Sequence, residues 1–187
     1  FLHQTSGELE LAEEMFKKAL ELNEALGRKE HMAVNFNNLG SLYEARVELE
    51  LAEEMYQKSL EINKALGRKE RMAYDFNTLG ILHCSRGELE LAEEMYQKSL
   101  EINKALGHKK DMTINFTNLG NIYKTRGELE LAEEMFKKSL AINEALGHKE
   151  RMADDFSRLG DLYEARGEFD LAGEMYFSAI EINFKNI

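Results

Sequence analysis

The pattern of hydrophobic and polar positions repeats along the chain with a period of 40 residues. Ala-Leu-Gly recurs and ends at Gly27, Gly67, Gly107 and Gly147. The segment Glu-Leu-Glu-Leu-Ala-Glu-Glu-Met begins at Glu8, Glu48, Glu88 and Glu128, and a degraded copy begins at Glu168. A period of this length indicates stacked supersecondary units, each in contact mainly with its neighbours.

The spacing of apolar residues inside one unit predicts two helices. In the first, offsets of three and four residues place one stripe on one face, formed by Met32, Phe36, Leu39, Gly40 and Tyr43. The second is expected from about residue 48 to residue 66, where Gly67 can take the left-handed conformation that ends a helix. The chain lacks proline and is rich in good helix formers, so an all-α fold is predicted.

A glycine recurs in the middle of each predicted first helix, at Gly40, Gly80, Gly120 and Gly160. Such a residue costs about 1 kcal/mol relative to alanine. The recurrence predicts a close approach of two helix backbones, with Ala52 as the small partner of Gly40. Tyr56 is then expected to fill space toward the next repeat.

These positions together form a recognisable motif: aromatic, Leu-Gly, Tyr, Ala, Tyr at Phe36, Leu39, Gly40, Tyr43, Ala52 and Tyr56. The motif resembles the tetratricopeptide repeat, whose usual length is about 34 residues. The longer unit is similar to the repeats of kinesin light chains and of spindle adaptors. The resemblance implies an α-solenoid of antiparallel helix pairs in a right-handed superhelix, with about four and a half repeats. Val47 departs from the pattern, because other units carry glycine there.

We expect residues 1–187 to form a single array. It comprises a partial repeat at 1–32, full repeats at 33–72, 73–112 and 113–152, and a terminal repeat at 153–187. A solenoid needs polar caps, and both ends lack one. The apolar end residues are Phe1, Leu2, Met175, Tyr176, Phe177, Ile180, Ile182, Phe184 and Ile187, and Gly173 replaces a glutamate. Either the native protein continues past both ends, as expected of a fragment of a longer protein, or these edges meet another chain.

Composition narrows the classes of partner. The net charge of −11 disfavours DNA or RNA, and no run of about 18 apolar residues is present to span a membrane. Cys84 is the only cysteine, so an intrachain disulfide is excluded. This fits a reducing compartment, and we expect a cytoplasmic protein.

The units differ from one another mainly on the first-helix face opposite the packing stripe. In the resembled family that face lines a concave groove that holds a peptide. The candidate groove residues are Val34, Asn37, Asn38, Ser41, Tyr74, Asn77, Thr78, Ile81, Ile114, Asn118, Asn121, Lys124, Asp154, Arg158 and Asp161. Asparagine offers a donor and an acceptor to a peptide backbone. We expect a peptide with few charges, basic where it meets Asp154 and Asp161; the alternative is a solvated helix face.

The sequence offers no apparatus for catalysis, so we expect neither an enzyme nor a metal or other cofactor. No histidines have the spacing of metal ligands, and Cys84 lacks a histidine base on its face. We expect His108 and His148 in exposed connectors and His83 in the core. Asp154, Asp155 and Asp161 are expected to form a solvated acidic patch.

Two functional hypotheses follow. The first is a scaffold that binds a peptide segment of a partner protein in the groove. The alternative is a self-assembling module, in which homo-oligomers form through the uncapped terminal helices or by helix exchange.

Overall fold

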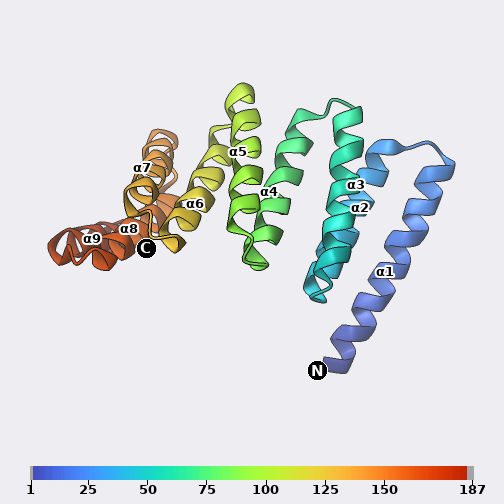
Figure 1. Ribbon diagram of the computed structural model, residues 1–187, viewed down its shortest axis with the longest axis horizontal. Helices are drawn as coiled ribbons and strands as arrows, with labels where there is room; N and C mark the ends of the chain where they lie inside the picture. Colours follow the sequence, from blue (N-terminus) through green and yellow to red (C-terminus); the bar gives the residue numbers. More distant parts are fainter. Residues whose placement is uncertain (1, 185–187) are drawn as a thin grey trace. The chain divides into compact units, whose positions relative to one another are not determined.

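The computed structural model describes residues 2–184, with side chains from residue 7 onward; Phe1 and Ile187 lie outside this part, as does the Leu2 side chain. The described residues form nine helices and no strand (Figure 1). The helices are α1 (Leu2–Ala25), α2 (Lys29–Ala45), α3 (Leu49–Ala65), α4 (Lys69–Ser85), α5 (Leu89–Leu106), α6 (Lys109–Thr125), α7 (Leu129–Leu146), α8 (Lys149–Ala165) and α9 (Phe169–Phe184). The predicted all-α fold and the two helices per repeat are confirmed.

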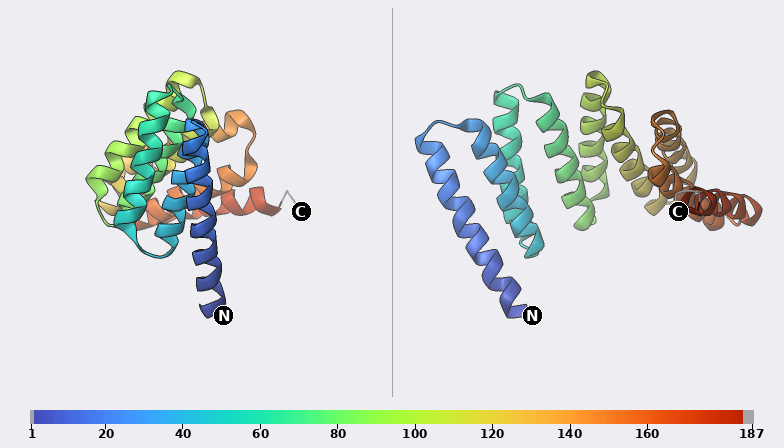
Figure 2. Two further views of the ribbon diagram at one scale, coloured as in Figure 1. Left: turned by 90° about the vertical axis from the view of Figure 1, so that its right-hand side faces the viewer. Right: turned by 180° about the vertical axis from the view of Figure 1, so that it is seen from behind.

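The chain divides into two compact units, Phe1–Ile102 and Asn103–Ile187. In the first unit, α1 packs on α2, α2 on α3 and α3 on α4. In the second unit, α6 packs on α7, α7 on α8 and α8 on α9. Short connectors make consecutive helices antiparallel, and the 24-residue α1 extends beyond its neighbour α2 (Figure 2). Even-numbered helices are therefore the first helices of repeats, and odd-numbered helices are the second.

Each connector closes with a residue in the left-handed conformation. Gly67 has φ +66°, and its amide donates to the carbonyl of Lys64 at 3.1 Å. The next amide, of Arg68, reaches back to the carbonyl of Asn63 at 2.9 Å, which completes a Schellman motif. Val47 adopts the same conformation with φ 62°, although its branched side chain is disfavoured there.

An aromatic ring lies against the mid-helix glycine of each repeat. A Cβ built on Gly40 would lie 2.5 Å from a ring carbon of Tyr56, and one built on Gly120 would lie 2.5 Å from the ring of Phe136. The prediction about Gly40 was therefore wrong in its partner. The glycine makes room for a ring of its own repeat, not for Ala52, and Tyr56 points back to its own first helix, where its hydroxyl donates to Glu44 at 2.8 Å.

A glutamate on each of several second helices joins one repeat to the next. Glu133 accepts hydrogen bonds from the Tyr163 hydroxyl at 2.8 Å and from Arg166 at 2.5 Å. Burial alone would raise the pKa of Glu133, but these bonds and Lys137 outweigh burial and hold the pKa at about 2. Glu13 is held in the same way by Lys17, Arg46 and Tyr43. In both cases the carboxylate remains charged at a partly buried interface between α helices of neighbouring repeats.

We predict that Val47→Gly stabilises the protein by about 1 kcal/mol, because glycine adopts the left-handed conformation without the clash of a Cβ. The gain should appear as a higher midpoint in urea unfolding. The reverse change in the matched connector, Gly87→Val, should lower the midpoint, since Gly87 has φ +75°. If Val47→Gly does not raise the urea midpoint, the left-handed backbone of Val47 does not strain the native protein.

We also predict that Gly120→Ala destabilises the second unit by about 1–3 kcal/mol, because its new methyl group would overlap the ring of Phe136. The control is Gly173→Ala in α9, where an added Cβ meets nothing within 4 Å. That change should raise stability by about 1 kcal/mol through helix propensity. Urea unfolding of both variants, followed by circular dichroism, distinguishes the two glycines.

Candidate functional site

A line of buried polar pairs joins second helices to the first helices that follow them, and the sequence interpretation missed it. In each pair, an asparagine amide donates to the side chain 12 residues later. The pairs are Asn23 with Asn35 (2.9 Å), Asn63 with Asp75 (2.7 Å), Asn103 with Asn115 (2.9 Å) and Asn143 with Asp155 (2.7 Å). The recurrence of asparagine every 40 residues was the signal that could have revealed these pairs.

The interpretation of Asp155 as part of a solvated acidic patch was wrong. Asp155 is only 2% exposed and accepts hydrogen bonds from Asn143 and from Ser139, the latter at 3.1 Å. Burial raises the pKa of Asp155, although these two donors oppose the rise. Asp75 has the same position in its repeat: burial raises its pKa, while Asn63 and Ser59 oppose the rise. Asp154 and Asp161 are exposed, as expected.

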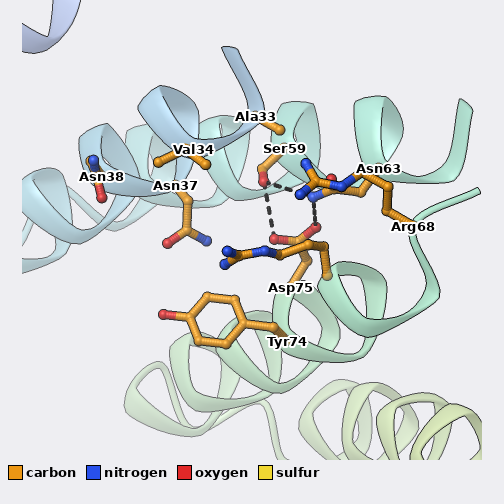
Figure 3. A pocket seen from close by; sticks show the side chains of 10 residues that line it. Ala33, Val34, Asn37, Asn38, Ser59, Asn63, Arg68, Tyr74 and Asp75 are labelled. Carbon is orange, nitrogen blue, oxygen red and sulfur yellow. Dashed lines mark hydrogen bonds between the residues drawn. The ribbon is translucent and has the colours of Figure 1, made fainter. Parts of the chain in front are cut away.

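The first unit places the predicted face of α2 opposite the same face of α4. A cavity of about 140 Å³ opens between them. Figure 3 shows Val34, Asn37 and Asn38 on one side and the Tyr74 ring on the other. Ser59, Asn63 and Asp75 form its polar floor, and their hydrogen bonds fix the floor's shape. Val34 and Tyr74 are 42% and 52% exposed, so an apolar surface borders the cavity.

The second unit has an equivalent cavity of about 420 Å³. Ile114 and Asn118 of α6 occupy the places of Val34 and Asn38. The lining differs in that Asp154 replaces the aromatic ring of Tyr74, Thr117 replaces Asn37, and Arg158 is added. The floor is again polar, and is formed by Ser139, Asn143 and Asp155.

The predicted groove residues are all at least partly accessible, and eight of the fifteen line the two cavities. Those eight are Val34, Asn37, Asn38, Tyr74, Ile114, Asn118, Asp154 and Arg158. The others line neither cavity: Ser41, Asn77, Thr78, Ile81, Asn121, Lys124 and Asp161. Thr78 donates its hydroxyl to the carbonyl of Tyr74 within its own helix, at 3.1 Å.

Asp161 is already engaged inside the protein. Its carboxylate lies 3.4 Å from the ammonium of Lys124 and accepts a hydrogen bond of 2.9 Å from the Tyr176 hydroxyl. Lys124 and Asp161 therefore offset each other's charge along the face of the second unit.

The histidines do not form a metal site in the described part of the chain. His83 is 6% exposed, as predicted for a core ring, and its Nδ1 lies 2.7 Å from Glu88. His108 and His148 were expected to be exposed, but both are half-buried. Among the residues whose side chains are described, no three His, Cys, Asp or Glu residues gather as metal ligands would. Within residues 2–184, no helix is long and apolar enough to cross a membrane.

The repeats of this chain match a known protein family. The sequence model of the tetratricopeptide repeat matches residues 1–65, 33–105, 70–145 and 110–183. The chain belongs to the tetratricopeptide repeat family. Its resemblance to that family is confirmed, and so is the α-solenoid fold class. Members of this family are generally protein-interaction scaffolds.

Solved structures of other proteins have the same fold as this chain. BtubC (BKLC) from P. vanneervenii matches with a TM-score of 0.88 and 25% identity, over 98% of this chain and 76% of that one. A Podosopora anserina protein described as a kinesin light chain with nearly identical TPR-like repeats has a TM-score of 0.79 and 18% identity, over 98% and 91%. MamA has a TM-score of 0.71 and 20% identity, over 98% and 93%. No curated protein matches the sequence.

We predict that the two buried aspartates make stability depend on pH. Because their folded pKa values lie above the unfolded value, their contribution is present below pH of about 4 and is lost as pH rises through the folded pKa. The Asp75→Asn/Asp155→Asn double variant should therefore lose less unfolding free energy than the parent between pH of about 4 and about 7. Urea unfolding at a series of pH values measures this difference.

The chain supplies a matched control, because Asn115 holds the same place in the pair with Asn103. Asn115→Asp introduces an ionisable group there and should add a loss of stability over the same pH interval. Equal slopes in all three proteins would show that the buried carboxylates do not control the pH dependence.

Proposed function

We propose that this chain is a non-enzymatic scaffold that binds a peptide segment of a partner protein along the first-helix faces of its units. The observation that carries the proposal is the pair of equivalent cavities between first helices, one at Val34 and Tyr74 and one at Ile114 and Asp154. Each combines a fixed polar floor with accessible apolar and amide side chains, the combination expected of a specific binding site.

The chemistry of the cavity walls favours different peptide side chains in the two units. In the first, Val34 and Tyr74 offer apolar contact, so an uncharged side chain fits there. In the second, Asp154 favours a donor or a basic side chain, while Arg151 and Arg158 of the same cavity favour an acceptor. Asn38 and Asn118 stand at the edges, where a carboxamide can bond to a peptide backbone whatever its sequence.

The composition of the chain bears on the class of partner and on the cellular location of the scaffold. We propose a protein or peptide partner, with no nucleic acid or membrane as ligand, in keeping with the net charge of −11. We propose a cytoplasmic location and a single array over residues 1–187. The low cysteine content supports the location, and the regular period supports the array.

Self-assembly through the ends is the second candidate. Exposed apolar side chains lie along one face of α1, at Leu11, Met15 and Leu22, and Leu26 directly after the helix is exposed as well. A head-to-tail contact between this face and the other end of a second copy would propagate into fibres. Light scattering over a range of concentrations tests it: a mass that stays at 21.5 kDa would reject self-assembly.

We predict that peptides selected from a diverse array will bind the parent and lose affinity in groove variants. Tyr74→Ala should weaken binding about tenfold, because it removes the largest accessible apolar surface of the first cavity. Asn38→Ala should weaken binding by a few-fold, as expected for the loss of one hydrogen bond. Fluorescence anisotropy with the selected peptides measures both effects.

The control for Asn38→Ala is Gln57→Ala, which removes a carboxamide from an exposed position of α3 outside the cavity. It should leave the affinity unchanged. Binding that persists in both groove variants, or that falls equally in the control, would place the peptide elsewhere on the protein.

A further inference from the structure

The second cavity has an acidic and a basic side chain on the same wall. Asp154 and Arg158 both line it, and both belong to α8. They are four residues apart, which places them side by side on one helix face. We call them the α8 pair. The first cavity has no such pair, because Tyr74 and Thr78 hold the two places and the Thr78 hydroxyl bonds to its own helix.

Both charges of the α8 pair are available to a ligand. In the part of the chain whose side chains are described, neither member forms a hydrogen bond or an ion pair. Burial is the main cause of the raised pKa of Asp155, but the charges of Arg158 and Asp154 also act on it, in opposite directions. Both charges therefore lie close to the cavity floor. Asp161, further along the same helix, differs because Lys124 lies 3.4 Å from it and offsets its charge.

The charges around the whole cavity nearly balance. Arg151 is its second cation and donates to the Thr113 hydroxyl at 3.3 Å. Glu150 and Asp154 are exposed acidic residues, and Asp155 is buried in the floor. A carboxylate in the cavity would meet these acidic groups, and an ammonium group would meet two guanidinium groups. Since like charges in contact are unfavourable, the cavity suits a polar ligand group without net charge.

A primary carboxamide matches the α8 pair without bringing a charge. Its oxygen can accept from the guanidinium of Arg158, and its nitrogen can donate to the carboxylate of Asp154. Both hydrogen bonds would have an ionised partner, which makes them roughly twice as strong as bonds between neutral groups.

The amide of a peptide backbone does not match the pair in the same way. In a trans peptide bond the N–H and the C=O point in opposite directions, so one bond cannot offer both to a single wall. A primary carboxamide has its oxygen and one N–H on the same edge. In a peptide, this group occurs in the side chains of asparagine and glutamine.

We propose that the second cavity is a subsite that selects an asparagine or glutamine side chain of the bound peptide through Asp154 and Arg158. The inference rests on the proposed function, because it assigns the peptide side chain that this cavity takes. The methylene carbons of that side chain lie against Ile114, and the volume of about 420 Å³ leaves room for them. The first cavity, with Tyr74 in place of Asp154, does not select a carboxamide.

The test begins with a displayed library of random peptides, captured on the immobilised 187-residue chain and sequenced. We expect asparagine or glutamine to be enriched at one peptide position over the unselected library. In a captured peptide with glutamine there, changing this residue to methionine, glutamate or lysine should weaken binding at least about tenfold, because the α8 pair loses a partner or meets a like charge. Fluorescence anisotropy measures the four affinities.

A double variant and a matched control assign the preference to the α8 pair. Asp154→Tyr/Arg158→Thr gives α8 the residues that α4 carries at the same places, so circular dichroism and the urea midpoint should stay close to those of the parent. It should bind the glutamine and methionine peptides within about twofold of each other. Glu134→Tyr/Lys138→Thr removes an exposed ion pair of α7 outside the cavity and should keep the preference for glutamine.

The outcomes separate this inference from the groove proposal. If the chain captures peptides in which neither asparagine nor glutamine is enriched, carboxamide selection is overturned and the groove proposal stands. Carboxamide selection by the α8 pair is also overturned if the double variant keeps the preference for glutamine, or if the α7 control loses it. If the chain captures no peptide at all, the groove proposal and this inference both fail.

Discussion

An aromatic ring of each second helix lies directly on a glycine of its own first helix, and this contact sets how closely the two helices of a repeat approach. Only a residue without a Cβ leaves room for the ring, as the pairs of Gly40 with Tyr56 and Gly120 with Phe136 show. Close packing of this kind tolerates little change in volume. Because the first helix is fixed in this way, its opposite face is presented outward at a constant place in every repeat.

Contacts between repeats include buried and partly buried polar side chains beside the apolar core. Glu133 accepts hydrogen bonds from Tyr163 of the following helix and from Arg166 at that helix's C-terminal end, and Asn143 donates to the buried Asp155. Such groups cost free energy if they are left without partners, so they favour one arrangement of neighbouring helices over others. The same buried pairs form the floors of the cavities, and one set of interactions therefore fixes both the packing and the shape of the candidate binding site.

The two cavities share a polar floor but differ in their walls. Each cavity between first helices combines amide side chains, a polar floor and a wall that differs, formed by Tyr74 in one and Asp154 in the other. This chemistry suits an extended peptide whose individual side chains contact the cavities.

The repeat, the helical fold and the family follow from the sequence alone, because a 40-residue period and helical spacing depend only on local patterns. The outward face of the first helices followed from the same spacing. The contacts between helices did not follow from the sequence. The sequence could not show that Asp155 is buried while Asp154 is exposed, since neighbouring positions on a helix point in different directions. Nor could it show that Gly40 faces a ring while Gly173 faces open space, because that distinction depends on which helices pack together in three dimensions.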